Sequence, residues 1–231
     1  MRTRSSSEIE GLLWREWKAV IKVAFTTSFA DDEWRQKLVG FVMDVKTKPV
    51  LESSGEVCRV HGQTVWVDLP VFGAAMREAW DVGTASDASD KDAQDRWVNI
   101  NAFTSDLVET VAAAHKTDPD FSLYGIWTIR TSLEEDSKEE GKPDVTALKA
   151  AAVWFIHASN TLLDFCKQGK QFQGKVAQAG SLYRGEFNGF STERWQAWVV
   201  RLKKLAEADN PDEEAKQLVQ EALKAAEQAQ K

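Results

Sequence analysis

The hydrophobic residues of this chain recur mostly three or four positions apart, which is the spacing of amphipathic helices. Ser7-Glu-Ile-Glu10 has the form of a helix-capping box, and the pattern after it predicts a helix over about residues 8–28. Asp31 begins a second predicted helix, which Pro49 ends because proline cannot continue a helix. The apolar stripe of this second helix consists of Trp34, Leu38, Phe41, Val42 and Val45.

A different spacing marks residues 57–68, where four valines flank His61-Gly62 and predict a small β-hairpin. Pro70 suits the first turn of a short third helix. The stretch from Asp81 to Asp92 consists mainly of small and acidic residues, too polar to be buried. We therefore predict a mobile loop there.

The helical pattern continues in the second half of the chain. A fourth predicted helix ends before Pro119, and Asp120 caps a fifth. Asp144 begins a long sixth helix that reaches Gln168, and Ser191 begins a seventh. The fourth helix carries an apolar stripe of Trp97, Ile100, Leu107, Val108 and Val111, and the fifth carries Leu123, Ile126, Trp127 and Leu133.

Two other segments have unusual compositions. Residues 169–190 hold five glycines, a density that no regular helix keeps. After Asn210-Pro211 the chain is rich in Ala, Glu, Gln and Lys, which favours a helix. Only Leu218, Val219 and Leu223 could anchor this tail, so it is predicted to pack loosely or to project.

Together these elements predict an all-α fold of about seven or eight helices with a minor β-hairpin. The chain has 231 residues, 43% of them hydrophobic, which is enough for one sizeable core. The sequence shows no internal repeat at a fixed period, which argues against a helical solenoid. We expect a single globular domain over residues 1–209 and a C-terminal helical extension over residues 210–231.

The charge balance excludes several classes of partner. A net charge of -7 and a pI near 5.2 provide no basic excess for binding nucleic acid or an anionic membrane. No stretch approaches the roughly 18 apolar residues of a membrane span. Cys58 and Cys166 form no spaced framework, which fits a reducing compartment. We expect a cytoplasmic protein with no nucleic-acid partner, and its protein partner is not readable from the sequence.

Tryptophan is strongly over-represented, with 10 Trp against 2 Tyr. Buried indoles add much apolar surface, and each brings an N–H group that needs a partner. The plainer interpretation is a Trp-rich helical core. The alternative is a flat apolar pocket whose walls include some of these rings.

The sequence contains no recognisable motif for binding a cofactor or a metal, or for a catalytic nucleophile. Gly169-Lys-Gln-Phe-Gln-Gly174-Lys175 nearly spells a phosphate-binding loop, but Val176 replaces the required hydroxyl and a helix precedes it. His61, His115 and His157 lack the spacing of a metal site. We therefore expect neither a bound metal nor a cofactor.

Several Trp-bearing segments resemble a family of fungal proteins known as a domain of unknown function. They are Asp68–Trp80, Trp97–Phe103, Asp120–Trp127 with Arg130 and Leu133-Glu134, and Arg194–Leu202. The resemblance covers about residues 10–205 and leaves out the tail after Asn210. It implies an all-helical fold and a fungal source, and it carries no catalytic residues.

Polar residues within these apolar stripes are the best functional signal. A buried amide, guanidinium or imidazole needs partners, so each marks an internal network or a pocket wall. On the first interpretation, Arg130 pairs with Glu134 or another acid, and Asn101 and His157 bond neighbouring helices. On the second, a cleft is formed with His157 as general acid or base. The ligand-binding residues would then be Trp97, Asn101, Trp127, Arg130 and Trp154.

Two functions follow from these alternatives. The first is a small-molecule binder of fungal secondary metabolism, such as a cofactor-independent isomerase or cyclase acting on an apolar substrate, which needs neither a nucleophile nor a metal. The second is a non-enzymatic interaction or scaffold module whose Trp residues are core. A closed Trp-lined cavity would favour the first, and a filled core with an exposed apolar groove would favour the second.

Overall fold

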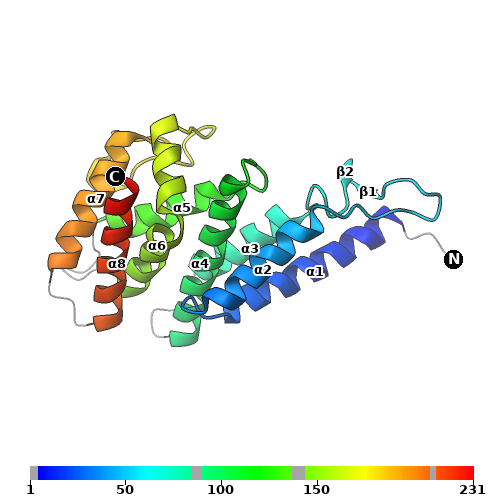
Figure 1. Cartoon of the computed structure of the whole chain (residues 1–231), viewed down its shortest axis with the longest axis horizontal. Coiled ribbons are helices and arrows are strands. Elements are labelled where there is room, and N and C mark those ends of the chain that lie inside the picture. Colours follow the sequence, from blue (N-terminus) through cyan, green and yellow to red (C-terminus); the bar gives the residue numbers. More distant parts are fainter. Residues whose placement is uncertain (1–4, 85–89, 137–143, 209–211) are drawn as a thin grey trace. The chain divides into compact units, whose positions relative to one another are not determined.

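The computed structural model describes residues 5–84, 90–136, 144–208 and 212–231. In this part of the chain the fold is all-α, with eight α-helices and one small antiparallel sheet (Figure 1). The chain forms two compact units, residues 1–100 and 101–231, and the boundary falls inside helix α4 (Lys91–Ala113). The predicted fold class is confirmed, while the single domain over residues 1–209 stays a prediction.

Helix α1 (Ser6–Thr26) begins the first unit. Its capping box joins Ser5 and Glu8, whose backbone N–H groups each bond the other's side chain at 2.7 and 3.2 Å. The capping box predicted at Ser7 is therefore wrong by two residues. The Ser-x-x-Glu spacing occurs both at Ser5 and at Ser7, and only the first begins the helix. Helix α1 packs on α3 (Phe72–Thr84), with Trp17 against Phe72, and the buried residues of α1 are Leu13, Trp17, Ile21 and Ala24.

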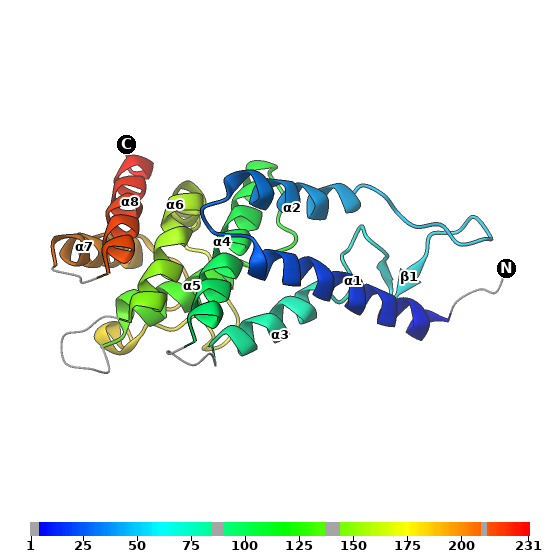
Figure 2. The same cartoon turned by 90° about the horizontal axis from the view of Figure 1, so that it is seen from below.

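Helix α2 (Asp32–Val45) is capped by Asp31, as predicted. Its buried residues are Arg35, Val39 and Val42. Most of the apolar stripe predicted from the sequence lies on another face, since Trp34 is 59% and Phe41 48% exposed. Helices α1 and α2 diverge from the short connection between them (Figure 2).

The predicted hairpin is confirmed as two short strands, β1 (Arg59–Val60) and β2 (Gln63–Thr64), with Arg59 opposite Thr64. The predicted loop over residues 81–92 is wrong at both ends, because α3 continues to Thr84 and α4 begins at Lys91. Residues 85–89 lie outside the described part of the chain.

The second unit is built around α6 (Val145–Gln168), which starts after the Asp144 cap and ends at the left-handed Gly169. Helix α6 packs on α5 (Ser122–Ile129), α7 (Thr192–Glu207) and α8 (Glu213–Ala229). A π-helical turn, η1 (Arg130–Glu134), extends α5, and the glycine-rich segment contains one 3-10 turn, η2 (Ser181–Tyr183).

Helix α8 is part of the core of this unit, so the expectation of a loosely packed tail is wrong. It lies against α6 and α7 (Figure 1). The small size of its alanines permits this close packing, which a count of large hydrophobic residues misses. Its buried residues are Ala215, Leu218, Val219, Ala222 and Ala226.

Candidate functional site

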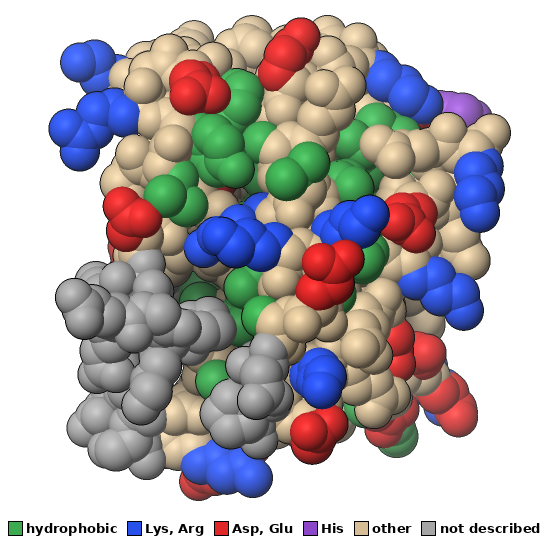
Figure 3. All heavy atoms as spheres, turned by 90° about the vertical axis from the view of Figure 1, so that its left-hand side faces the viewer, with side chains coloured by type: hydrophobic (Ala, Val, Ile, Leu, Met, Phe, Trp, Pro, Cys, Tyr) green, Lys and Arg blue, Asp and Glu red, His purple; other side chains and the backbone are tan. Residues whose placement is uncertain are grey.

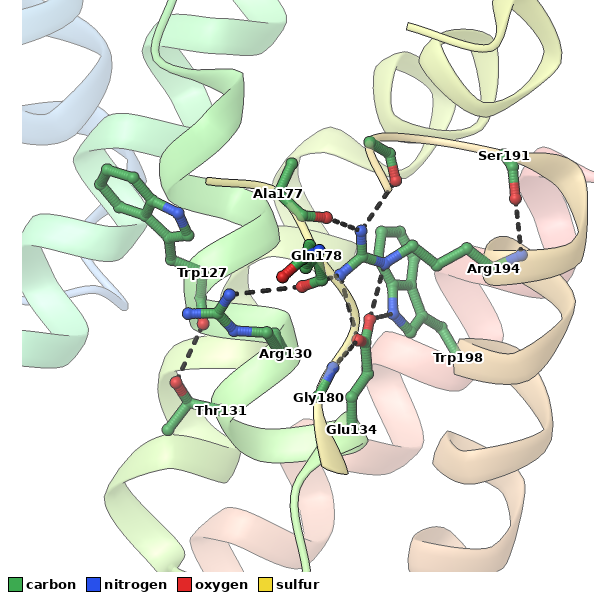
Figure 4. Close-up of polar contacts among 11 residues, drawn as sticks. Trp127, Arg130, Thr131, Glu134, Ala177, Gln178, Gly180, Ser191, Arg194 and Trp198 are labelled. Carbon is green, nitrogen blue, oxygen red and sulfur yellow. Dashed lines mark hydrogen bonds and ion pairs between the residues drawn. The ribbon is translucent and has the colours of Figure 1, made fainter. Parts of the chain in front are cut away.

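A completely buried ion pair lies in the second unit. The Glu134 carboxylate accepts hydrogen bonds from Arg194 Nε at 2.7 Å and Nη2 at 3.0 Å (Figure 4). It also accepts from Trp198 Nε1 at 2.6 Å and from the Gly180 backbone N–H at 2.9 Å. Glu134 and Arg194 are both 0% exposed. Such a pair stabilises a fold only when its remaining donors are also satisfied.

Those remaining donors bind the glycine-rich segment. Arg194 Nη1 donates to the carbonyls of Ala177 at 2.7 Å and Gly189 at 2.8 Å. Gly180 lies so close to Glu134 that a Cβ atom would come within 2.4 Å of the Glu134 carbonyl oxygen. The cluster therefore fixes residues 177–190 on η1 and α7 and has the character of a structural clamp.

Arg130 lies elsewhere than expected. It is half-buried, and its Nη1 donates to the Gln178 carbonyl at 3.3 Å. The half-buried Trp127 donates from Nε1 to the Val176 carbonyl at 2.7 Å. The pairing of Arg130 with Glu134 is wrong, because Arg194 holds that carboxylate. The sequence signal for Arg194 was its place within the Trp-bearing segment that carries the family resemblance.

Asn101 and Trp154 meet in the core of the second unit. Asn101 Oδ1 accepts from Trp154 Nε1 at 2.7 Å and from Thr128 Oγ1 at 2.8 Å. Asn101, Thr128 and Trp154 are all buried. A Cβ atom on Gly125 would lie 2.9 Å from the Trp154 ring, so this neighbourhood is filled.

His157 lies near the α4 side of α6. Its Nδ1 is 3.6 Å from Asp106 Oδ1, and the two side chains are 14% and 4% exposed. One turn along α6, Thr161 donates to Glu109 at 2.5 Å. Trp97 belongs to the first unit, where its ring packs edge-on against Trp80 with centroids 4.8 Å apart.

Neither cysteine has the environment of a nucleophile. Burial raises the pKa of Cys166 to about 12 and also raises the pKa of Cys58. The reactive thiolate is therefore scarce at neutral pH. In the described part of the chain, no three His, Cys, Asp or Glu side chains are grouped so that they could hold a metal ion.

An apolar groove of about 520 Å³ lies in the first unit between α1 and α2. Trp17 and Trp66 line it, with ring centroids 5.4 Å apart. Arg15 and Glu16 line it and are paired at 2.9 Å. Its apolar walls are formed by Leu12, Ala19, Val20 and Val23 from α1 and by Leu38 and Phe41 from α2.

The outer face of α7 and α8 differs from this groove. Acidic and basic side chains are interspersed there, with small groups of hydrophobic side chains between them (Figure 3). Among the helices of residues 5–84, 90–136, 144–208 and 212–231, none combines the length and the hydropathy of a membrane-spanning segment.

The described residues thus define an all-α protein with a buried carboxylate–guanidinium clamp in one unit and an open apolar groove in the other. The chain belongs to the family described as Protein of unknown function (DUF3632), which matches residues 17–202. This match extends over most of the chain and includes parts of both units. No curated protein and no solved structure matches the chain.

Proposed function

We propose that this protein is a non-enzymatic interaction module that binds a helix of another protein in the groove between α1 and α2. The observation that carries the proposal is the apolar stripe of α2. Trp34, Leu38, Phe41 and Val45 repeat with a 4-3-4 spacing, yet Trp34 and Phe41 remain about half exposed. Such a stripe on a single helix normally packs against another helix.

Helix α1 offers a matching stripe. Leu12, Ala19 and Val23, with the half-exposed Glu16 among them, follow the same 4-3-4 spacing and line the same groove. Two helices that present such stripes along one groove can receive a third helix between them, as in known helix-in-groove complexes. Phe41, which lines the groove, and Trp34, two turns before it on the same face of α2, would be the large anchors, because aromatic residues are enriched at protein interfaces.

The residues expected to bind a small molecule support that function less well. Asn101 and Trp154 bond each other in a filled core, and Trp127 and Arg130 bond backbone carbonyls. Each of these side chains therefore already has a structural partner.

The proposed function can be tested with designed amphipathic peptides of about three heptads and the full chain. Calorimetry should detect binding of at least one peptide, and Phe41→Glu should weaken it at least tenfold by placing a charge in the groove. Val200→Glu is the matched control, because Val200 is 68% exposed on α7. Failure of every peptide to bind, or equal binding by Phe41→Glu, would overturn the proposal.

A small-molecule binder, such as a cofactor-independent isomerase or cyclase, is the second candidate. His157 beside Asp106 favours it, since a carboxylate can orient an imidazole that acts as a general base. A thermal-shift screen of apolar small molecules tests it. The candidate fails if no compound raises the melting temperature.

A further inference from the structure

The outer edges of the groove carry charges in a regular pattern. When the stripes of α1 and α2 are written as heptad positions a and d, the outer flanking g positions are Arg15, Lys22, Lys37 and Asp44. Three of these four residues are basic. The side chains of Arg15 and Lys37 are 71% and 55% exposed. The opposite e positions of α2 are the buried Arg35 and Val42, so they face the core instead.

We infer that the partner in this groove is an acidic amphipathic helix, with apolar residues at its a and d positions and Glu or Asp at its e and g positions. This inference rests on the proposed function and names the chemistry of the partner. Flanking charges select the partner of a helix by complementarity, so a basic rim selects carboxylates.

The basic side chains can reach such a partner. Arg15 and Lys37 form ion pairs with Glu16 at 2.9 Å and Glu33 at 2.5 Å, but both pairs are exposed. Exposed ion pairs contribute little to stability, so a partner carboxylate can replace the internal one at low cost. Lys37 also lies 4.8 Å from the centre of the Trp34 ring, which places its charge beside the apolar stripe.

Two other occupants fit less well. A second copy of this chain would bring three basic flanking positions against the same three, and like charges disfavour that pairing. A membrane surface would have to enter a concave groove, and the net charge of -7 opposes binding to anionic lipid. The acidic helix satisfies both the shape and the charge of the groove.

The test compares three peptides with the same Leu stripe and with Glu, Gln or Lys at every e and g position. We expect the Glu peptide to bind the full chain at least tenfold more tightly than the Gln peptide, and the Lys peptide to bind most weakly. The preference should fall as salt is added, because the flanking charges are exposed. The double variant Arg15→Glu/Lys37→Glu should reverse the order, while Lys203→Glu/Lys204→Glu on α7 keeps it.

The outcomes separate this inference from the proposed function. Equal binding of all three peptides, or tightest binding of the Lys peptide, overturns the inference and leaves a helix-binding groove. Binding by none overturns both. Self-association of the natural chain that Phe41→Glu abolishes would assign the groove to a second copy. If the natural chain cosediments with anionic phospholipid vesicles and Phe41→Glu does not, the groove binds a membrane surface instead.

Discussion

The Glu134–Arg194 pair shows how one buried residue depends on another. Arg194 makes hydrogen bonds to the Glu134 carboxylate and to three backbone carbonyls, and both side chains are fully buried. Arg194→Met would leave the Glu134 charge in an apolar environment. We expect a loss of about 3–5 kcal/mol in the free energy of unfolding, measured by urea titration.

Arg130→Met is the matched control for this prediction, because Arg130 makes one long hydrogen bond and is only half-buried. It should cost under about 1 kcal/mol. A small effect of Arg194→Met, close to that of Arg130→Met, would contradict the clamp. The double variant Glu134→Leu/Arg194→Met should recover part of the loss, since it removes the stranded charge.

The sequence could not identify this pair for a physical reason. Helical spacing placed Leu123, Trp127 and Arg130 on one inner face, but the buried face of α5 contains Tyr124, Gly125 and Thr128. A π-helical turn then follows, which inserts a residue and shifts the phase of the helix. Glu134 is thereby buried, whereas a regular 3.6-residue period cannot predict the faces of residues 130–134.

Helix α8 is a structural part of the second unit. Ala222 is 0% exposed at a position where α8 packs on its neighbours. Ala222→Glu would bury an unpaired charge and should lower the free energy of unfolding by about 3 kcal/mol or more. Gln220→Glu, on the exposed face of α8, should change it by less than about 0.5 kcal/mol.

Thermal and urea unfolding of these two variants measure the difference. Similar melting temperatures for Ala222→Glu and Gln220→Glu would mean that α8 separates from the unit in solution, as the sequence alone predicted.

Three predicted helix starts are confirmed, because a cap is local. Asp31, Asp144 and Ser191 each accept a hydrogen bond from the backbone N–H three residues later. The predicted cap at Asp120 is wrong, since Phe121 is the N-cap of α5 and no side chain caps that helix. What covers a helix face was not predictable. The spacing of Trp34, Leu38 and Phe41 correctly places them on one face of α2, but it does not say whether that face meets the core or solvent.

Two ion pairs, Asp120–Lys170 and Asp212–Lys149, make the stability of the protein sensitive to acid. Burial alone would raise the pKa of Asp120, but hydrogen bonds from Lys170 and Ser122 lower it below its ordinary value. The bond from the Ala215 backbone N–H, assisted by Lys149, lowers the pKa of Asp212. Lys170 and Lys149 lie 2.8 and 3.2 Å from these carboxylates.

A carboxylate whose pKa is lowered by folding contributes stability that is complete above its unfolded pKa, near 3.8. That contribution is lost as the pH falls through the lowered folded value. The double variant Asp120→Asn/Asp212→Asn should therefore melt at a lower temperature than the natural chain at pH 7, with the gap closing between about pH 5 and pH 2. Asp164→Asn, exposed on α6, is the control, and a constant gap at all pH values would refute the assignment.

The distribution of tryptophan has an optical consequence. Five of the ten indoles, those of Trp17, Trp80, Trp154, Trp195 and Trp198, are at most 2% exposed, whereas Trp34, one turn before the groove-lining Leu38 on α2, is 59% exposed. A water-soluble quencher such as iodide or acrylamide therefore reaches the Trp34 indole more readily than these buried rings. A helix seated over α2 would shield that ring, so the emission of the natural chain itself reports whether the groove is occupied.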